Sequence, residues 1–148
     1  MTKYLEDFTV GDKQKSPGRT VTDTDLAMFT WLSGDNNPAH TDEEFCRKNS
    51  PFKTRILQGA YGFSVATGLS AQIGEMAGSA IASLGVENWV YKGPILVGDT
   101  LWLETEVVEA RPTSKPGRGV VKRKFSLINQ KGEVVQEGLS SVLVYARA

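Results

Sequence analysis

Four long strand-like segments in the second half of the chain constrain the fold more than any other feature. They are rich in β-branched and aromatic residues, which favour extended structure, and they span residues 81–91, 99–110, 119–129 and 133–146. The last two are joined by an Asn-Gln-Lys-Gly sequence typical of a hairpin turn. Long strands joined by turns predict a meandering antiparallel sheet. Its unpaired edges predict a homodimer or higher homo-oligomer with a shared sheet.

A segment of small residues, 56–76, comes before these strands and predicts a helix. It contains four glycines, each of which costs about 1 kcal/mol in a helix interior relative to alanine. Such a composition suits a helix that other backbone or a ligand approaches closely. We therefore expect a buried central helix with the sheet wrapped around it, an α+β fold. The length of 148 residues predicts a single domain over residues 1–148.

Composition narrows the class of protein. The 17 basic and 17 acidic residues balance, so no excess charge indicates nucleic acid or a membrane as a partner. No apolar run approaches the roughly 20 residues of a membrane-spanning helix, and the first residues lack the pattern of a signal peptide. A single cysteine, Cys46, excludes an internal disulfide and suits the cytoplasm. With one cysteine and one histidine, a structural zinc site is not expected.

The only histidine, His40, lies five residues after Asp35 in a turn that contains an Asn-Pro pair. Thr22 and the acidic residues after it predict the start of a helix, and Gly34 predicts its end, so this helix leads into the turn. One interpretation is that Asp35 and His40 flank a water, one as base and one as acid. The other is that the turn is structural, capped by Asp and Asn side chains and closed by a histidine hydrogen bond. Spacing alone leaves both open.

The start of the central helix offers a second candidate group. The Gly59 amide, at the positive end of the helix dipole, could stabilise an oxyanion, although glycine is also ordinary at a helix N-terminus. Further along, Thr67 could reach the catalytic carboxylate or its water, or could bond to a carbonyl of its own helix. A basic cluster in the later strands could hold the phosphates of an anionic tail or form a solvated strand face; it comprises Lys115, Arg118, Lys122, Arg123 and Lys124.

The turn and its surroundings resemble the MaoC-like dehydratases, which include the (R)-specific enoyl-CoA hydratases. The signature of that family is Ser-Gly-Asp, any residue, Asn-Pro, an apolar residue and His. Residues 33–40 read Ser-Gly-Asp-Asn-Asn-Pro-Ala-His. The resemblance covers nearly the whole chain and includes residues 4–12, 18–25, 55–59 and 94–99.

This resemblance implies a hotdog fold, in which a curved antiparallel sheet wraps a long helix, usually as a homodimer. It implies an acyl-CoA thioester as substrate, a place in fatty acid metabolism, and no cofactor. Asp35 and His40 become the catalytic pair and the Gly59 amide the oxyanion donor. Asn37 would support the turn, and Thr67 would be a pocket hydroxyl. The implied reaction adds water to a trans-2-enoyl thioester to give a (3R)-3-hydroxyacyl thioester, or reverses this.

Three positions depart from the usual pattern of the family. Gln58 stands where His is common, Ala39 is smaller than the usual Leu or Ile, and Tyr61 stands where Met and Leu are frequent. We expect Gln58 and Tyr61 to add polar groups to the substrate pocket and to favour a short or oxygen-bearing acyl group over a long fatty chain. Two other functions stay open: a thioesterase on the same fold, and a non-catalytic acyl-thioester-binding module.

Overall fold

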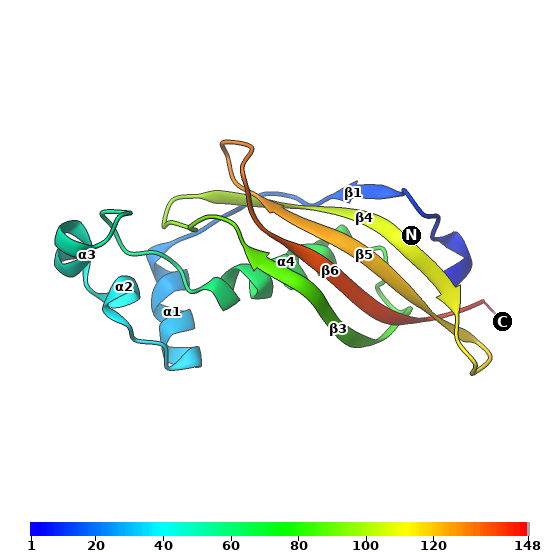
Figure 1. Ribbon diagram of the computed structural model, residues 1–148. Coiled ribbons are helices and arrows are strands. Elements are labelled where there is room, and N and C mark those ends of the chain that lie inside the picture. The colour runs from blue at the N-terminus through cyan, green and yellow to red at the C-terminus, as the bar shows by residue number, and fades with distance from the viewer. Residues whose placement is uncertain (148) are drawn as a thin grey trace.

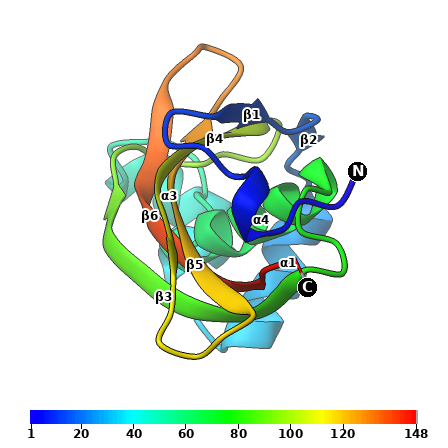
Figure 2. The same ribbon diagram turned by 90° about the vertical axis from the view of Figure 1, so that its right-hand side faces the viewer.

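A six-stranded antiparallel sheet curves around one long helix in the computed structural model, which describes residues 1–147 (Figures 1 and 2). The strands are β1 (Lys13–Lys15), β2 (Arg19–Thr20), β3 (Ala80–Tyr91), β4 (Thr100–Pro112), β5 (Arg118–Ile128) and β6 (Val134–Tyr145). The helices are the 3-10 turn η1 (Leu5–Asp7), α1 (Asp23–Ser33), α2 (Pro38–Thr41), α3 (Glu43–Asn49) and the central helix α4 (Gly59–Ile73). Among the described residues, no helix combines the length and apolar character needed to cross a membrane.

The order of strands in the sheet is β1-β4-β5-β6-β3, with β2 also paired to β4. The predicted meander is therefore correct for β4, β5 and β6 but wrong for β3, which pairs with β6 rather than with β4. The connection from β3 to β4 runs past the start of α4, where the Leu57 amide donates a hydrogen bond to the carbonyl of Ile95. By passing the N-terminal end of α4, the chain leaves the sheet after β3, at one edge, and re-enters it as β4, on the far side of β6 and β5. The antiparallel sheet around a buried helix confirms the predicted α+β layout.

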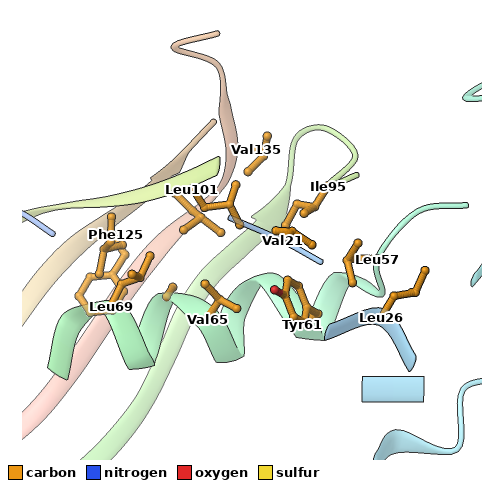
Figure 3. Close-up of a cluster of buried hydrophobic side chains, with 13 residues drawn as sticks. Val21, Leu26, Leu57, Tyr61, Val65, Leu69, Ile95, Leu101, Phe125 and Val135 are labelled. Carbon is orange, nitrogen blue, oxygen red and sulfur yellow. The ribbon is translucent and has the colours of Figure 1, made fainter. Parts of the chain in front are cut away.

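The core lies between α4 and the inner face of the sheet (Figure 3). Val65 and Leu69 of α4 are at most 5% exposed and belong to one cluster with Leu101 and Phe125. The small residues of α4 permit this close approach, because a Cβ at Gly62 would overlap the side chain of Gln136 on β6. The expectation of a tightly approached central helix is confirmed.

Helices α1, α2 and α3 extend beyond one end of the sheet (Figure 1). Thr22 caps α1 as predicted: its hydroxyl accepts from the Asp25 amide, and the Asp25 carboxylate accepts from the Thr22 amide. Arg55 ties the segment together, since its Nε lies 2.7 Å from the Glu43 carboxylate of α3 and its Nη2 lies 3.0 Å from the Asp23 carboxylate of α1. These bonds raise the pKa of Arg55.

Strand β3 forms an edge of the sheet over its whole length. Within residues 1–147 it pairs only with β6, and it exposes four large apolar side chains: Leu84, Val86, Val90 and Tyr91. An exposed apolar edge of this length is a typical site of association with another strand.

Candidate active site

The turn after α1 brings Asp35 and His40 together. Gly34 ends α1 in the left-handed conformation, with a φ of 73°, and turns the chain away from the helix axis. Asn37 then caps the single turn α2, because its side-chain oxygen accepts from the Ala39 amide at 2.9 Å. This places His40 on α2 with its Nε2 3.5 Å from Oδ2 of Asp35. Asn37 supports the turn as the resemblance implied.

A backbone carbonyl determines which nitrogen of His40 faces the site. The Nδ1 of His40 lies 2.6 Å from the carbonyl oxygen of Ile56. A carbonyl only accepts, so Nδ1 carries the proton and Nε2 of the neutral imidazole has a free lone pair. The Asp35 carboxylate and Nε2 are then two acceptors side by side, and one water can donate a hydrogen to each. Both sequence interpretations find support, since the turn is capped and closed by hydrogen bonds and also presents a converging acid and imidazole.

Gln58 lies beneath this turn rather than in a pocket. Its side chain is buried, and its Nε2 donates to the carbonyl of Asp35 at 3.1 Å and to the Thr30 hydroxyl at 2.9 Å. Its Oε1 is also buried and has no hydrogen-bond partner in the described part of the chain. Gln58 therefore holds the backbone of Asp35 against α1, which is a positioning role that the sequence did not suggest.

Gly59 begins α4 in close contact with β3. Its amide donates no hydrogen bond within residues 1–147, as expected in the first turn of a helix, and its carbonyl accepts from Gln136 Nε2 at 2.8 Å. A Cβ at this position would overlap the ring of Tyr91. A cavity of about 380 Å³ adjoins Gly59, Tyr91 and Ile56. Asp35 and His40 do not line it, but hydrogen bonds join both to the segment that runs into Gly59.

Thr67 lies at a second cavity, between the later part of α4 and the inner face of the sheet. This cavity measures about 400 Å³ and is lined mainly by small and apolar side chains. The Thr67 hydroxyl donates to the carbonyl of Ser64 in its own helix at 2.7 Å, which is the second of the two alternatives for this residue. Thr67 follows Gly59 by eight residues, or about 12 Å of helix.

Tyr61 lies in the core and lines none of the cavities described above. Its ring packs edge-on against Phe29 of α1, with the ring centres 5.7 Å apart. The hydroxyl is buried with no hydrogen-bond partner among residues 1–147. Burial, with the Asp25 carboxylate as a further cause, raises the pKa of Tyr61 to about 12. This position gives no support to the expected role in a substrate pocket.

The basic cluster does not form one surface. Side chains alternate along β5, so Lys124 is exposed on the outer face and Arg123 is buried on the inner face. Lys122 lies 3.2 Å from Glu87 on β3. A solvated strand face describes Lys124 but not Arg123.

Sequence reasoning missed the residues that support the site from a distance. Gln136 accepts from Trp89 Nε1 at 3.0 Å and donates to the Gly59 carbonyl. It lies 77 residues after Gly59, so no local spacing connects them. The available signal was a polar residue, Gln136, in a strand expected to bury apolar side chains.

The chain was compared with known protein families. A family model described as "MaoC like domain" matches residues 7–127. The (R)-specific enoyl-CoA hydratase of Rhodospirillum rubrum is 33% identical over 144 residues, which cover 97% of this chain and 93% of that relative. Protein MaoC of Klebsiella aerogenes is 36% identical over 99 residues, which cover 67% of this chain; the match spans only 29% of that longer relative.

Solved structures share the fold. The structure described as a monoamine oxidase regulatory protein from Archaeoglobus fulgidus superposes with a TM-score of 0.89 at 34% identity, over 99% of this chain and 97% of that one. A conserved hypothetical protein from Mycobacterium tuberculosis, described as a double hotdog fold, has a TM-score of 0.84 at 19% identity over 99% of this chain and 45% of that one. The hotdog fold implied by the sequence is confirmed, and the chain belongs to the MaoC-like dehydratase family.

Proposed function

We propose that this protein is a hydro-lyase that reversibly adds water to a trans-2-enoyl-CoA thioester and gives a (3R)-3-hydroxyacyl thioester. The observation that carries the proposal is the pairing of Asp35 Oδ2 with His40 Nε2 at 3.5 Å, with the other imidazole nitrogen held by the Ile56 carbonyl. Membership of the family, and the similarity to the (R)-specific enoyl-CoA hydratase of Rhodospirillum rubrum, support the same reaction.

The pair would activate a water by accepting both of its hydrogen bonds. In hydration, the water oxygen bonds to C3 of the substrate, and one proton of the water passes to the Asp35–His40 pair. The electrons of the C2–C3 double bond move to the thioester, which becomes an enolate. The pair then returns a proton to C2, so the net change is addition of H and OH. Acid–base catalysis by positioned groups contributes about 10²–10⁴-fold to the rate.

The Gly59 amide would stabilise the enolate oxygen. Its N–H has no partner within residues 1–147 and lies at the positive end of α4. The adjoining cavity, beside Tyr91, provides space for the thioester and the start of its pantetheine arm. Loss of one such donor typically costs about 3–4 kcal/mol in the transition state.

A homodimer would bring the two cavities together. We infer that β3 pairs with β3 of a second copy, because this edge is long, unpaired and apolar. In an antiparallel pair centred on the strand, the Ala80 end of one β3 lies beside the Tyr91 end of the other. The cavity at Thr67, which Ala80 also lines, would then receive the acyl chain of a thioester held at the partner's Gly59.

An activity assay with crotonyl-CoA and butyryl-CoA tests the proposal. Hydration removes the absorbance of the conjugated enoyl thioester without release of free thiol. Thiol release from butyryl-CoA would show a thioesterase instead. Binding of both esters with neither reaction would show a non-catalytic binding module. Chiral analysis of the product must give the (3R)-hydroxyacyl ester.

A further inference from the structure

Arg123 occupies a position where the strand pattern calls for an apolar residue. On β5 the side chains of Val121, Phe125 and Leu127 all face the core and are at most 2% exposed. Arg123 belongs to this same inward row, and its side chain is only 4% exposed. On the neighbouring strand it is paired with Ser140, which is also buried. Burial of a guanidinium is costly unless its charge is matched, and here burial lowers the pKa of Arg123.

The neighbours of Arg123 leave its hydrogen-bonding capacity largely unused. Its Nη2 donates to the Ser70 hydroxyl of α4 at 2.9 Å, and the guanidinium lies 5.1 Å from the centre of the Phe125 ring. Its Nε is buried and has no partner among residues 1–147. A guanidinium has five N–H donors arranged in a planar fork, so Arg123 satisfies few of them.

The charge of Arg123 is also incompletely matched. The nearest carboxylate is that of Glu75, at 3.9 Å from Nη1. Glu75 makes a much shorter contact with another cation, since its carboxylate lies 2.6 Å from Nζ of Lys3. The group of Lys3, Glu75 and Arg123 therefore holds two cations and one anion, and it keeps one positive charge in a largely buried setting.

This surplus charge lies at the wall of the 400 Å³ cavity. Arg123, Ser70 and Ser140 line the cavity together, among small and apolar residues such as Ala82 and Val142. A mostly apolar cavity with a few convergent polar groups is the usual form of a site for an organic ligand with one polar end. The fork of an arginine matches the two oxygens of a carboxylate.

We propose that Arg123 binds a carboxylate at the far end of the acyl group, and that the preferred substrates are therefore CoA thioesters of dicarboxylic acids. The inference rests on the proposed function, which places the acyl chain in this cavity. Arg123 would donate a hydrogen bond to each carboxylate oxygen from the two arms of its fork, while Ser70 and Ser140 are placed to donate further hydrogen bonds. The carboxylate would supply the negative charge that Lys3, Glu75 and Arg123 lack among themselves.

Binding measurements with saturated thioesters test this without any need for catalysis. Isothermal titration calorimetry would compare three pairs of equal chain length: succinyl- with butyryl-CoA, glutaryl- with pentanoyl-CoA, and adipyl- with hexanoyl-CoA. In at least one pair the dicarboxylic ester is expected to bind about 10- to 100-fold more tightly, the range of a charge-assisted hydrogen bond. Arg123→Met should abolish this preference.

Two further variants test whether the effect of Arg123→Met comes from lost recognition of the carboxylate rather than from lost stability of the protein. Lys124→Met removes the neighbouring charge on the outer face and should retain the full preference. Arg123→Lys keeps the charge but loses the fork, so it should retain part of it. The inference is overturned if the wild-type protein prefers no dicarboxylic ester of any length, whatever the variants do. It is also overturned if the preference survives in a folded Arg123→Met protein.

Failure of this inference differs from failure of the proposed function. Hydration of crotonyl-CoA without a preference for dicarboxylic esters would contradict the role of Arg123 and leave the proposed reaction intact. Tight binding of dicarboxylic esters without hydration of any enoyl ester would retain the role of Arg123 and remove the proposed reaction.

Discussion

The side-chain amide of Gln58 lies 3.1 Å from the carbonyl oxygen of Asp35 and holds the backbone of the candidate acid in place. This contact connects the residue before the central helix to the end of α1. It means that the position of one member of the Asp35–His40 pair depends on a residue outside the turn.

Replacement of Gln58 should therefore affect both stability and activity. Gln58→Leu removes the hydrogen bonds to the Asp35 carbonyl and the Thr30 hydroxyl, at a cost of about 1–3 kcal/mol. We expect a lower midpoint of urea unfolding and a fall in kcat. Gln72→Leu, at an exposed position on α4, is the matched control and should change neither. A Gln58→Leu protein with wild-type kcat would show that the contact does not position Asp35.

Asp35 and His40 should act as one unit. Asp35→Asn and His40→Gln are each expected to lower kcat for crotonyl-CoA by about 10²–10⁴-fold, and the double variant should lose little more than the worse single one. Circular dichroism should show an intact fold. Glu44→Gln, an exposed carboxylate on α3, serves as the control. Normal activity in either folded single variant would exclude that residue from catalysis.

Gly59 should tolerate no side chain. In Gly59→Ala the new methyl group overlaps the Tyr91 ring, so the start of α4 or the Tyr91 ring must shift, and we expect kcat to fall by about 10²–10³-fold. Gly68→Ala is a sharp control because open space surrounds that position. It should stabilise the protein by up to about 1 kcal/mol. The double variant Gly59→Ala/Tyr91→Ala should recover activity relative to Gly59→Ala, and no recovery would contradict the steric argument.

The Tyr61 hydroxyl should make the stability of the protein fall at high pH. Its pKa is about 12 in the folded protein against an ordinary value of 10.0. The unfolded chain therefore loses this proton first, and the wild type loses stability as the pH rises through 10 towards 12. Tyr61→Phe has no such proton to lose. Its free energy of unfolding in urea should therefore rise by about 1 kcal/mol relative to that of the wild type between pH 7 and pH 10.5. Hydration activity at pH 7 should stay unchanged. A large loss of activity would show that Tyr61 does have a role in the substrate pocket.

The β3 edge should hold the dimer. Sedimentation equilibrium is expected to give a dimer for the wild-type protein and a monomer for the double variant Leu84→Lys/Val86→Lys, because paired charges on an edge strand prevent association. Val10→Lys, at an exposed apolar site outside β3, should remain dimeric. Since the cavities of two subunits would adjoin at this edge, the monomer should also lose activity. A dimer that survives the β3 substitutions would place the interface elsewhere.

The sequence predicted the elements well where short-range patterns decide them. All four long strands lie within two residues of their predicted ends, because alternation and turn residues mark them. Thr22 begins and Gly34 ends α1, as capping chemistry requires. The central helix is shorter than predicted, Gly59–Ile73 rather than 56–76, because its apolar pattern continues into the flanking segments.

Properties that depend on long-range packing could not be predicted in this way. Gln58 and Tyr61 were both expected in the pocket, but the packing of α1 against α4 turns one beneath the Asp35 turn and the other into the core. The partner of β3 depends on the path of the chain around α4, which no local sequence specifies. The acyl specificity was assigned to Gln58 and Tyr61, whereas the unmatched charge lies on Arg123, which periodicity places on the inner face of β5.

The hydrogen bonds that fix Asp35 and His40 come from the α1–α3 segment and residues 56–58, while the cavity wall that contains Arg123 belongs to the sheet and the later part of α4. The groups that carry the chemistry and the groups that select the acyl chain are thus held by different parts of the fold. Residues in one part can be exchanged, by evolution or by an engineer, without disturbing the other part. A library confined to positions 70, 123 and 140 should change the acyl preference of this scaffold while its acid–base pair stays intact.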